Sequence, residues 1–138
     1  MISPTLMESL LQFRDEREWK QFHTFRTLAT SIVLEAAELA EISQWTRDED
    51  LAATIQERRE RIEHEVADIA ILLSYLVHDL GIDLEQAVRA KLEVNAGKYP
   101  VAKSRGRSGN TTSWTSRPLA SGSDDLGPPG LEPGTKGL

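Results

Sequence analysis

The sequence predicts an all-α fold, a four-helix bundle-type domain that homo-oligomerisation would complete. Apolar residues recur at helical spacing through the first 100 or so positions, and no period-two apolar pattern persists that would indicate a strand. Residues that favour helix starts and stops stand between the apolar segments. A stretch of this length buries only a modest core, so association with other copies of the chain is expected.

The first helix is expected from Thr5 to Phe22, and the pair Thr5 and Glu8 predicts a capping box at its start. The second helix is expected from about Phe25 to Trp45, a stretch without Gly or Pro. Both segments carry apolar residues on one helical stripe, as expected for helices that pack against a common core.

The third helical segment is expected between Asp48 and Leu80, with a break near Arg58–Arg61, where charged residues replace apolar ones. Gly81 follows the apolar run and predicts a C-terminal stop. A fourth helix follows, with Asp83 as its cap and Gln86 three positions later.

Composition and charge exclude several classes of protein. The formal charge is −6 with no long basic run, which argues against a general nucleic-acid-binding surface. The absence of cysteine excludes disulfides and thiol-ligated metals. Neither a secretory signal nor an apolar stretch of about 20 residues is present, so we expect a cytoplasmic protein without a membrane partner.

Acidic residues interrupt the two most apolar helices. In the second helix Glu35, Glu38 and Glu41 recur every three residues and therefore share one stripe, where like charges repel each other. The nearest basic residues along the chain are Arg26 and Arg47, more than a turn away. The structural alternative is that this stripe is simply the solvated face of an amphipathic helix.

The third segment carries a second acidic pair, Glu65 and Asp68, at the same spacing. Apolar residues border Asp68 on both sides, so few orientations of the helix would leave it in water. A buried, unpaired carboxylate normally protonates, pairs or binds a metal. Two acidic pairs without His or Cys would form an all-oxygen site suited to Mg²⁺ or Mn²⁺ and to phosphate chemistry.

The order and spacing of these carboxylates resemble the MazG-like family, whose signature is ExxE on one helix and ExxD on the next. Here the signature reads Glu35-Ala36-Ala37-Glu38 and Glu65-Val66-Ala67-Asp68. The resemblance covers about residues 8–108. Three further segments are similar to the dCTP pyrophosphatase branch of the family: residues 13–23, 43–45 and 91–100.

The resemblance implies an enzyme that hydrolyses a nucleoside triphosphate, dCTP or a modified dNTP, to the monophosphate and pyrophosphate. Such an enzyme removes unwanted nucleotides from the pool and forms a homodimer or homotetramer. The implied catalytic Mg²⁺ ligands, for which Mn²⁺ is a possible substitute ion, are Glu35, Glu38, Glu65 and Asp68, with Glu41 as an auxiliary carboxylate. The implied substrate-binding residues are Trp19 and Trp45 at the base and Lys91, Asn95, Lys98 and Tyr99 at the phosphates or sugar.

Other interpretations stay open beside this one. The tryptophans also fit packing roles and the two lysines fit an ordinary solvated surface. Leu72 stands where some dCTP-selective members have Tyr, which leaves the base preference open. The whole chain also fits a non-catalytic helical interaction protein, or a nucleotide sensor that binds without cleaving.

We divide the chain into a nucleotide pyrophosphohydrolase domain over residues 1–105 and a flexible tail over residues 106–138, which is rich in Gly, Ser and Pro. Residues 109–114 can be back-translated so that a shifted frame encodes Lys-Tyr-Asp-Glu-Leu, an ending similar to that of relatives. We hypothesise that the tail is frameshifted or cloning-derived, which sequencing of the encoding DNA would decide.

Overall fold

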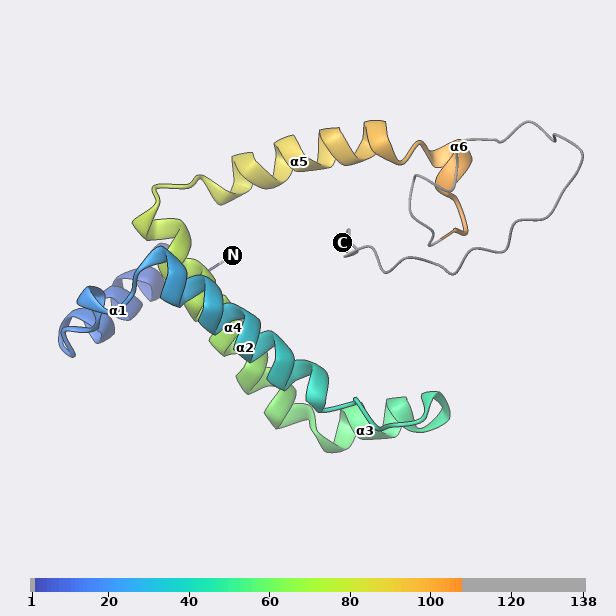
Figure 1. Cartoon of the computed structure of the whole chain (residues 1–138), viewed down its shortest axis with the longest axis horizontal. Coiled ribbons are helices and arrows are strands. Elements are labelled where there is room, and N and C mark those ends of the chain that lie inside the picture. The colour runs from blue at the N-terminus through green and yellow to red at the C-terminus, as the bar shows by residue number, and fades with distance from the viewer. Residues whose placement is uncertain (1, 108–138) are drawn as a thin grey trace, which may run out of the picture. The chain divides into compact units, whose positions relative to one another are not determined.

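The computed structural model of the chain describes residues 2–107, and within this range it contains helices and no strand, which confirms the all-α class. The elements, shown in Figure 1, are α1 (Pro4–Asp15), η1 (Trp19–Gln21), α2 (Phe25–Glu41), η2 (Asp48–Asp50), α3 (Leu51–Glu57), α4 (Arg59–Asp79), α5 (Leu84–Lys98) and α6 (Val101–Ser104). The chain divides into two compact units, Met1–Lys91 and Leu92–Leu138, and each is described by itself. Of the tail predicted over residues 106–138, residues 108–138 lie outside the described residues.

The single long first helix predicted from the sequence is wrong. The helix ends at Asp15, and Glu18 adopts a left-handed backbone conformation (φ 54°) before the short 3₁₀ turn η1. The predicted capping box is also wrong, because the cap is Ser3, whose hydroxyl accepts a hydrogen bond from the Leu6 N–H at 3.2 Å. Pro4 follows at the first helical position, where its missing N–H costs nothing.

Helix α2 begins at a reciprocal cap formed by two threonines. The Thr27 N–H donates to Thr24 Oγ1 at 3.2 Å, and the Thr24 N–H donates to Thr27 Oγ1 at 2.9 Å. The two threonines therefore form a competent helix start. The helix ends at Glu41, earlier than the predicted end at Trp45.

The third predicted segment is broken as expected. Arg58 leaves helical geometry (φ −102°, ψ 15°) between α3 and the 21-residue helix α4. Gly81 then adopts φ 62°, and its N–H donates to the His78 carbonyl at 3.1 Å, which confirms the predicted stop. The Asp83 carboxylate accepts from the Gln86 N–H at 3.0 Å, as the capping pattern predicted.

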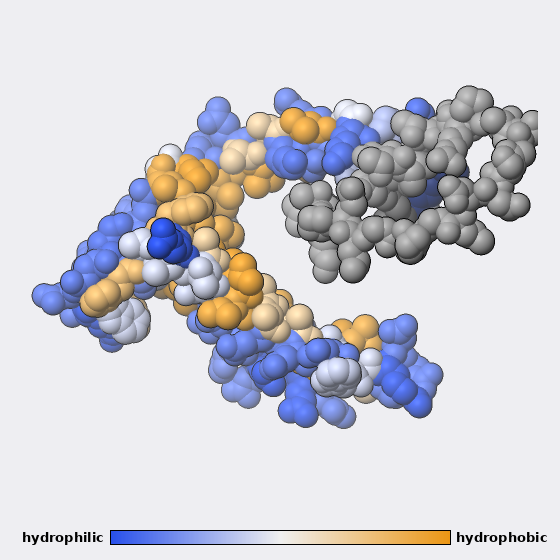
Figure 2. All heavy atoms as spheres, viewed as in Figure 1, coloured by the Kyte–Doolittle hydropathy of each residue, from blue (hydrophilic) through white to orange (hydrophobic). Residues whose placement is uncertain are grey.

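Helices α2 and α4 lie side by side along most of their length, with α1 beside α4 near one end of the pair and α3 at the other (Figure 1). Among the described residues the fully buried apolar side chains are Leu28, at 2% exposure, and Tyr75, at 4%. Figure 2 shows apolar side chains over the pair near its α1 end, while the tip at α3 is largely hydrophilic. The core is therefore small, and the two helices that carry the acidic pairs, α2 and α4, pack directly against each other.

None of the helices described here combines the length and the apolar content that crossing a bilayer requires.

Candidate functional site

Three carboxylates converge where α2 packs against α4. Oxygen atoms of Glu35 and Glu38 on α2 and of Glu65 on α4 all lie within 4.8 Å of one another. Glu35 is half-buried, Glu38 is exposed and Glu65 is 8% exposed. The three-residue spacing places the two α2 glutamates on one face, and packing against α4 brings Glu65 to them, so tertiary packing completes a cluster begun by helical periodicity.

Asp68, the fourth predicted ligand, is not part of this cluster. Its side chain is exposed, so the prediction that its apolar neighbours would bury it is wrong. Glu65, one turn earlier on α4, is the buried carboxylate instead. The reason is the rotation of α4, which turns Glu65 toward α2 and leaves Asp68 at the edge of the helix pair. Asp68 nevertheless lines a cavity together with Glu35.

The pKa of the Glu35 carboxyl is raised above its ordinary value of 4.5. Burial is the largest cause, followed by the negative charges of Glu38, Asp68 and Glu65. The other three predicted ligands thus all raise the pKa of Glu35, whether or not they belong to the cluster. A divalent cation bound here would stabilise the ionised form of Glu35 against both effects. A donor set made of carboxylate oxygens fits Mg²⁺ or Mn²⁺.

A basic side chain that the sequence interpretation did not consider reaches these carboxylates. Arg61, one turn before Glu65 on α4, lies 3.6 Å from Glu65 Oε1 and 3.6 Å from Glu41 Oε2 on α2. The expectation that the acidic stripe lacks a nearby basic partner is therefore wrong. The partner comes from the neighbouring helix, not from positions along α2.

A cavity of about 390 Å³ opens beside the carboxylates. Glu35 lines this cavity and is also a member of the carboxylate cluster. The cavity volume lies within the range usual for small-molecule sites. Its wall is mostly apolar and aromatic, with the carboxylates as its acidic groups. The lining residues are Leu10, Phe13, Trp19, His23, Glu35, Asp68, Ile71, Leu72 and Tyr75.

The aromatic rings of the cavity contact one another in a chain. Phe13 and Trp19 meet edge to face with centroids 5.8 Å apart, and Trp19 lies 6.3 Å from His23. His23 in turn lies 5.3 Å from the Tyr75 ring. Such a wall offers flat apolar faces to a planar ligand. Trp19 is part of this wall, and its role at a base stays a prediction.

The cavity wall is held by a network that the sequence interpretation missed. Arg14, only 3% exposed, pairs with Asp79 at 3.0 Å, and Lys20 reaches the same carboxylate at 2.6 Å. The Tyr75 hydroxyl donates to the Leu10 carbonyl at 2.7 Å. These contacts fasten α1 and η1 to the end of α4.

A pattern that was present in the sequence would have found part of this network. Asp68, Leu72, Tyr75 and Asp79 follow one another at steps of four, three and four residues, so they occupy one stripe of α4.

Burial alone would raise the pKa of Asp79, but hydrogen bonds from Lys20 and Arg14 outweigh it and hold that pKa below 3.8.

His23 is held in its neutral form. Burial, aided by the positive charges of Arg14 and Lys20 and opposed by Asp79, lowers the pKa of His23 below 6.5. A third positive charge beside Arg14 and Lys20 is therefore disfavoured, and the imidazole contributes to the cavity as an aromatic ring.

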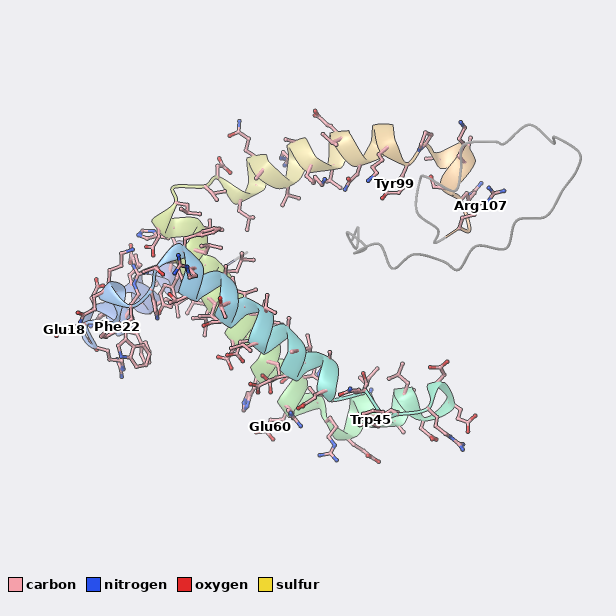
Figure 3. All side chains as sticks on the ribbon, in the orientation of Figure 1. Glu18, Phe22, Trp45, Glu60, Tyr99 and Arg107 are labelled. Atoms are coloured by element: carbon pink, nitrogen blue, oxygen red, sulfur yellow. The ribbon has the colours of Figure 1, made fainter. Side chains whose placement is uncertain are left out.

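Trp45 is not among the residues that line this cavity. It lies in the turn after α2 with 88% of its surface exposed. In Figure 3 it stands at the α3 end of the helix pair, whereas Phe22, two residues before the cap of α2, stands at the opposite end. Within one chain the structure does not bring Trp45 and Trp19 together.

The predicted phosphate- and sugar-binding residues lie on and after α5. Lys91 ends the first unit and is exposed. In the second unit the Tyr99 N–H donates to the Asn95 carbonyl at 2.7 Å, and Lys98 Nζ lies 5.5 Å from the Tyr99 ring centroid. Their roles at a substrate stay predictions.

The chain is similar in sequence to curated proteins of one kind. Over 97 residues the chain is 42% identical to dCTP pyrophosphatase 1 of Bos taurus, an alignment that covers 69% of this chain and 57% of that protein. It is 36% identical over 99 residues to dCTP pyrophosphatase 1 of Homo sapiens, covering 70% and 58%. The chain thus spans a little over half the length of these curated relatives.

A crystal structure of a pyrophosphatase from Archaeoglobus fulgidus is similar in fold. It superposes with a TM-score of 0.67 at 41% identity, over 70% of this chain and 90% of that one. The model of the MazG-like family matches residues 30–112, which include the whole carboxylate cluster. The chain therefore belongs to the MazG-like family.

Proposed function

We propose that this chain is a Mg²⁺-dependent nucleoside triphosphate pyrophosphohydrolase that acts on dCTP or a modified dNTP. Water would cleave the bond between the α and β phosphates, giving a nucleoside monophosphate and pyrophosphate. One observation carries the proposal: Glu35 belongs both to the carboxylate cluster and to the aromatic cavity, so one ligand can reach both. The names of the relatives and of the structural neighbour support the same chemistry.

The role proposed for each group of residues follows from its chemistry. Glu35, Glu38 and Glu65, with Asp68 at the cavity edge, would hold Mg²⁺ or, as a substitute, Mn²⁺. The ion would neutralise the triphosphate and polarise the α-phosphorus. Trp19 would stack on the base, an interaction worth about 1–3 kcal/mol.

The remaining predicted groups fit the same scheme. Lys91, Asn95, Lys98 and Tyr99 would meet the phosphates or the sugar, and the two lysines would supply positive charge to the phosphates. Leu72 lines the cavity, so the wall at this position is apolar. That wall does not favour one base through a hydrogen bond, which leaves room for a modified nucleotide. We propose a role in cleaning the nucleotide pool.

A panel of dNTPs and modified dNTPs, scored by pyrophosphate release with and without Mg²⁺, tests the proposal. We expect release from at least one deoxycytidine nucleotide, and no release when the metal is chelated. Thermal melts with Mg²⁺ and a non-hydrolysable nucleotide separate the alternatives, because a ligand that binds the folded state raises the Tm. A Tm shift without release would identify a nucleotide sensor, and neither effect would identify an interaction protein.

A further inference from the structure

The acidic cluster has a basic neighbour that contacts one carboxylate inside the cluster and one outside it. Arg61 Nε lies 3.6 Å from Oε1 of Glu65, the least exposed member of the cluster. Arg61 Nη2 lies 3.6 Å from Oε2 of Glu41, which is exposed and is not among the three converging glutamates. The guanidinium therefore stands between two anions at equal distance.

These contacts differ from an ordinary helix-surface ion pair, and α4 offers one for comparison. Arg59 and Glu63 have the same four-residue spacing, and Arg59 Nε donates a hydrogen bond to Glu63 Oε1 at 2.6 Å. Both of those side chains are exposed. At 3.6 Å neither contact of Arg61 is a hydrogen bond. Arg61 therefore acts on Glu65 through its charge and does not fix the orientation of the carboxylate.

A charge in this position opposes a divalent cation. Three carboxylates within 4.8 Å repel one another, and a guanidinium beside Glu65 relieves part of that repulsion while no metal is bound. The same positive charge repels a cation that approaches the cluster. Glu41 gives the guanidinium a second partner, with which it can pair when a bound cation occupies Glu65.

We propose that Arg61 is the built-in counter-ion of this metal site and sets its affinity for the divalent cation. It shares Glu65 and Glu41 while the cluster is free of metal and pairs with Glu41 alone when a cation binds. This inference rests on the proposed function, because it assumes that the three glutamates bind Mg²⁺. It makes Arg61 and Glu41 a pair with opposite effects: Arg61 weakens metal binding, and Glu41 strengthens it by drawing Arg61 away.

Calorimetric titration with Mg²⁺ alone, together with thermal melts, tests this on the full chain without nucleotide. Arg61→Gln should bind Mg²⁺ roughly 3–10-fold more tightly than the wild type, while its metal-free Tm falls. Arg59→Gln removes the same charge from the same helix two residues away, and it should leave the Mg²⁺ affinity within about twofold of the wild type.

Glu41→Gln should weaken Mg²⁺ binding, and this effect should largely vanish in the Arg61→Gln background, because Glu41 acts through Arg61. Unchanged or weaker binding by Arg61→Gln, with the wild type binding normally, would overturn the counter-ion role alone. An equal change of the Mg²⁺ affinity in Arg59→Gln would mean that general surface charge causes the effect, and this would overturn the counter-ion role as well. A wild-type chain that binds no Mg²⁺ would instead remove the metal site, and with it both proposals.

Discussion

The exposure of each predicted ligand determines which substitution tests the site cleanly. Glu65 is buried, so its replacement disturbs packing as well as metal binding. Glu38 and Asp68 are exposed, and their removal leaves the contacts of the core intact. The two exposed carboxylates are therefore the better positions at which to separate catalysis from folding.

Glu38→Gln and Asp68→Asn should each lower Mg²⁺-dependent pyrophosphate release by roughly 100-fold or more, because each removes a negative donor from the metal environment. Circular dichroism should show an unchanged helical signal. Glu63 is an exposed glutamate on α4 that pairs with Arg59, and Glu63→Gln is the matched control. This variant should keep the wild-type pyrophosphate release. If either test variant kept near-wild-type turnover, that residue would leave the proposed ligand set.

Asp79 offers a test of stability that does not involve the metal. Asp79→Asn should destabilise the fold by about 2–4 kcal/mol, because the buried guanidinium of Arg14 loses its counter-charge. The folded pKa of Asp79 lies below 3.8, so its stabilisation is complete above that pH and is lost as the pH falls through the folded pKa. The Tm difference from the wild type should therefore be constant near neutral pH and shrink below about pH 3.8. A difference that grew toward acid pH would contradict this assignment.

At the scale of elements, the end of α4 depends on one left-handed residue. Gly81 has φ 62° with open space around the position of a Cβ, so a side chain there is opposed by backbone conformation and not by crowding. Gly81→Ala should cost about 1–2 kcal/mol, measured by denaturant unfolding. Gly97, which has equal open space and no positive φ, is the control. Gly97→Ala should not reduce the stability, and equal losses in both variants would refute the conformational explanation.

At the scale of the whole molecule, one chain covers little of its own apolar surface. Leu28 is buried, but seven other apolar residues of α2 and α4 are only half-buried, and further apolar residues on or next to these helices are exposed. The half-buried residues are Ile32, Leu39, Ile62, Ile69, Leu73, Leu76 and Val77. The exposed ones on or next to the helix pair include Phe22, Phe25, Val33, Leu34 and Val66. Exposed apolar surface of this extent is typical of an interface.

We therefore expect an obligate homo-oligomer, a tetramer rather than a dimer, whose dissociation costs activity as well as stability. Trp45, at 88% exposure, is one side chain that a second copy would cover. Light scattering at micromolar concentration should give a multiple of the 15.4 kDa chain mass. A monomer mass with full activity would refute the expectation.

The sequence by itself determined the features that depend on neighbours along the chain. Helical periodicity, the Gly81 stop and the Asp83 cap are local, because they follow from backbone geometry within a few residues. The spacing of Glu35 and Glu38 also placed both on one face without knowledge of any partner. The left-handed Glu18 that shortens the first helix had no comparable local signal, since non-glycine residues adopt this conformation only when their surroundings impose it.

Only the tertiary structure decided which face of each helix meets another. A local pattern leaves the rotation of α4 undefined, and that rotation buries Glu65, exposes Asp68 and carries Arg61 to Glu41. The aromatic cavity likewise joins residues of α1 and η1 to residues of α4, and its His23–Tyr75 contact links positions about fifty residues apart. Such contacts are chosen by packing and by the pairing of charges between helices, which no spacing within one helix encodes.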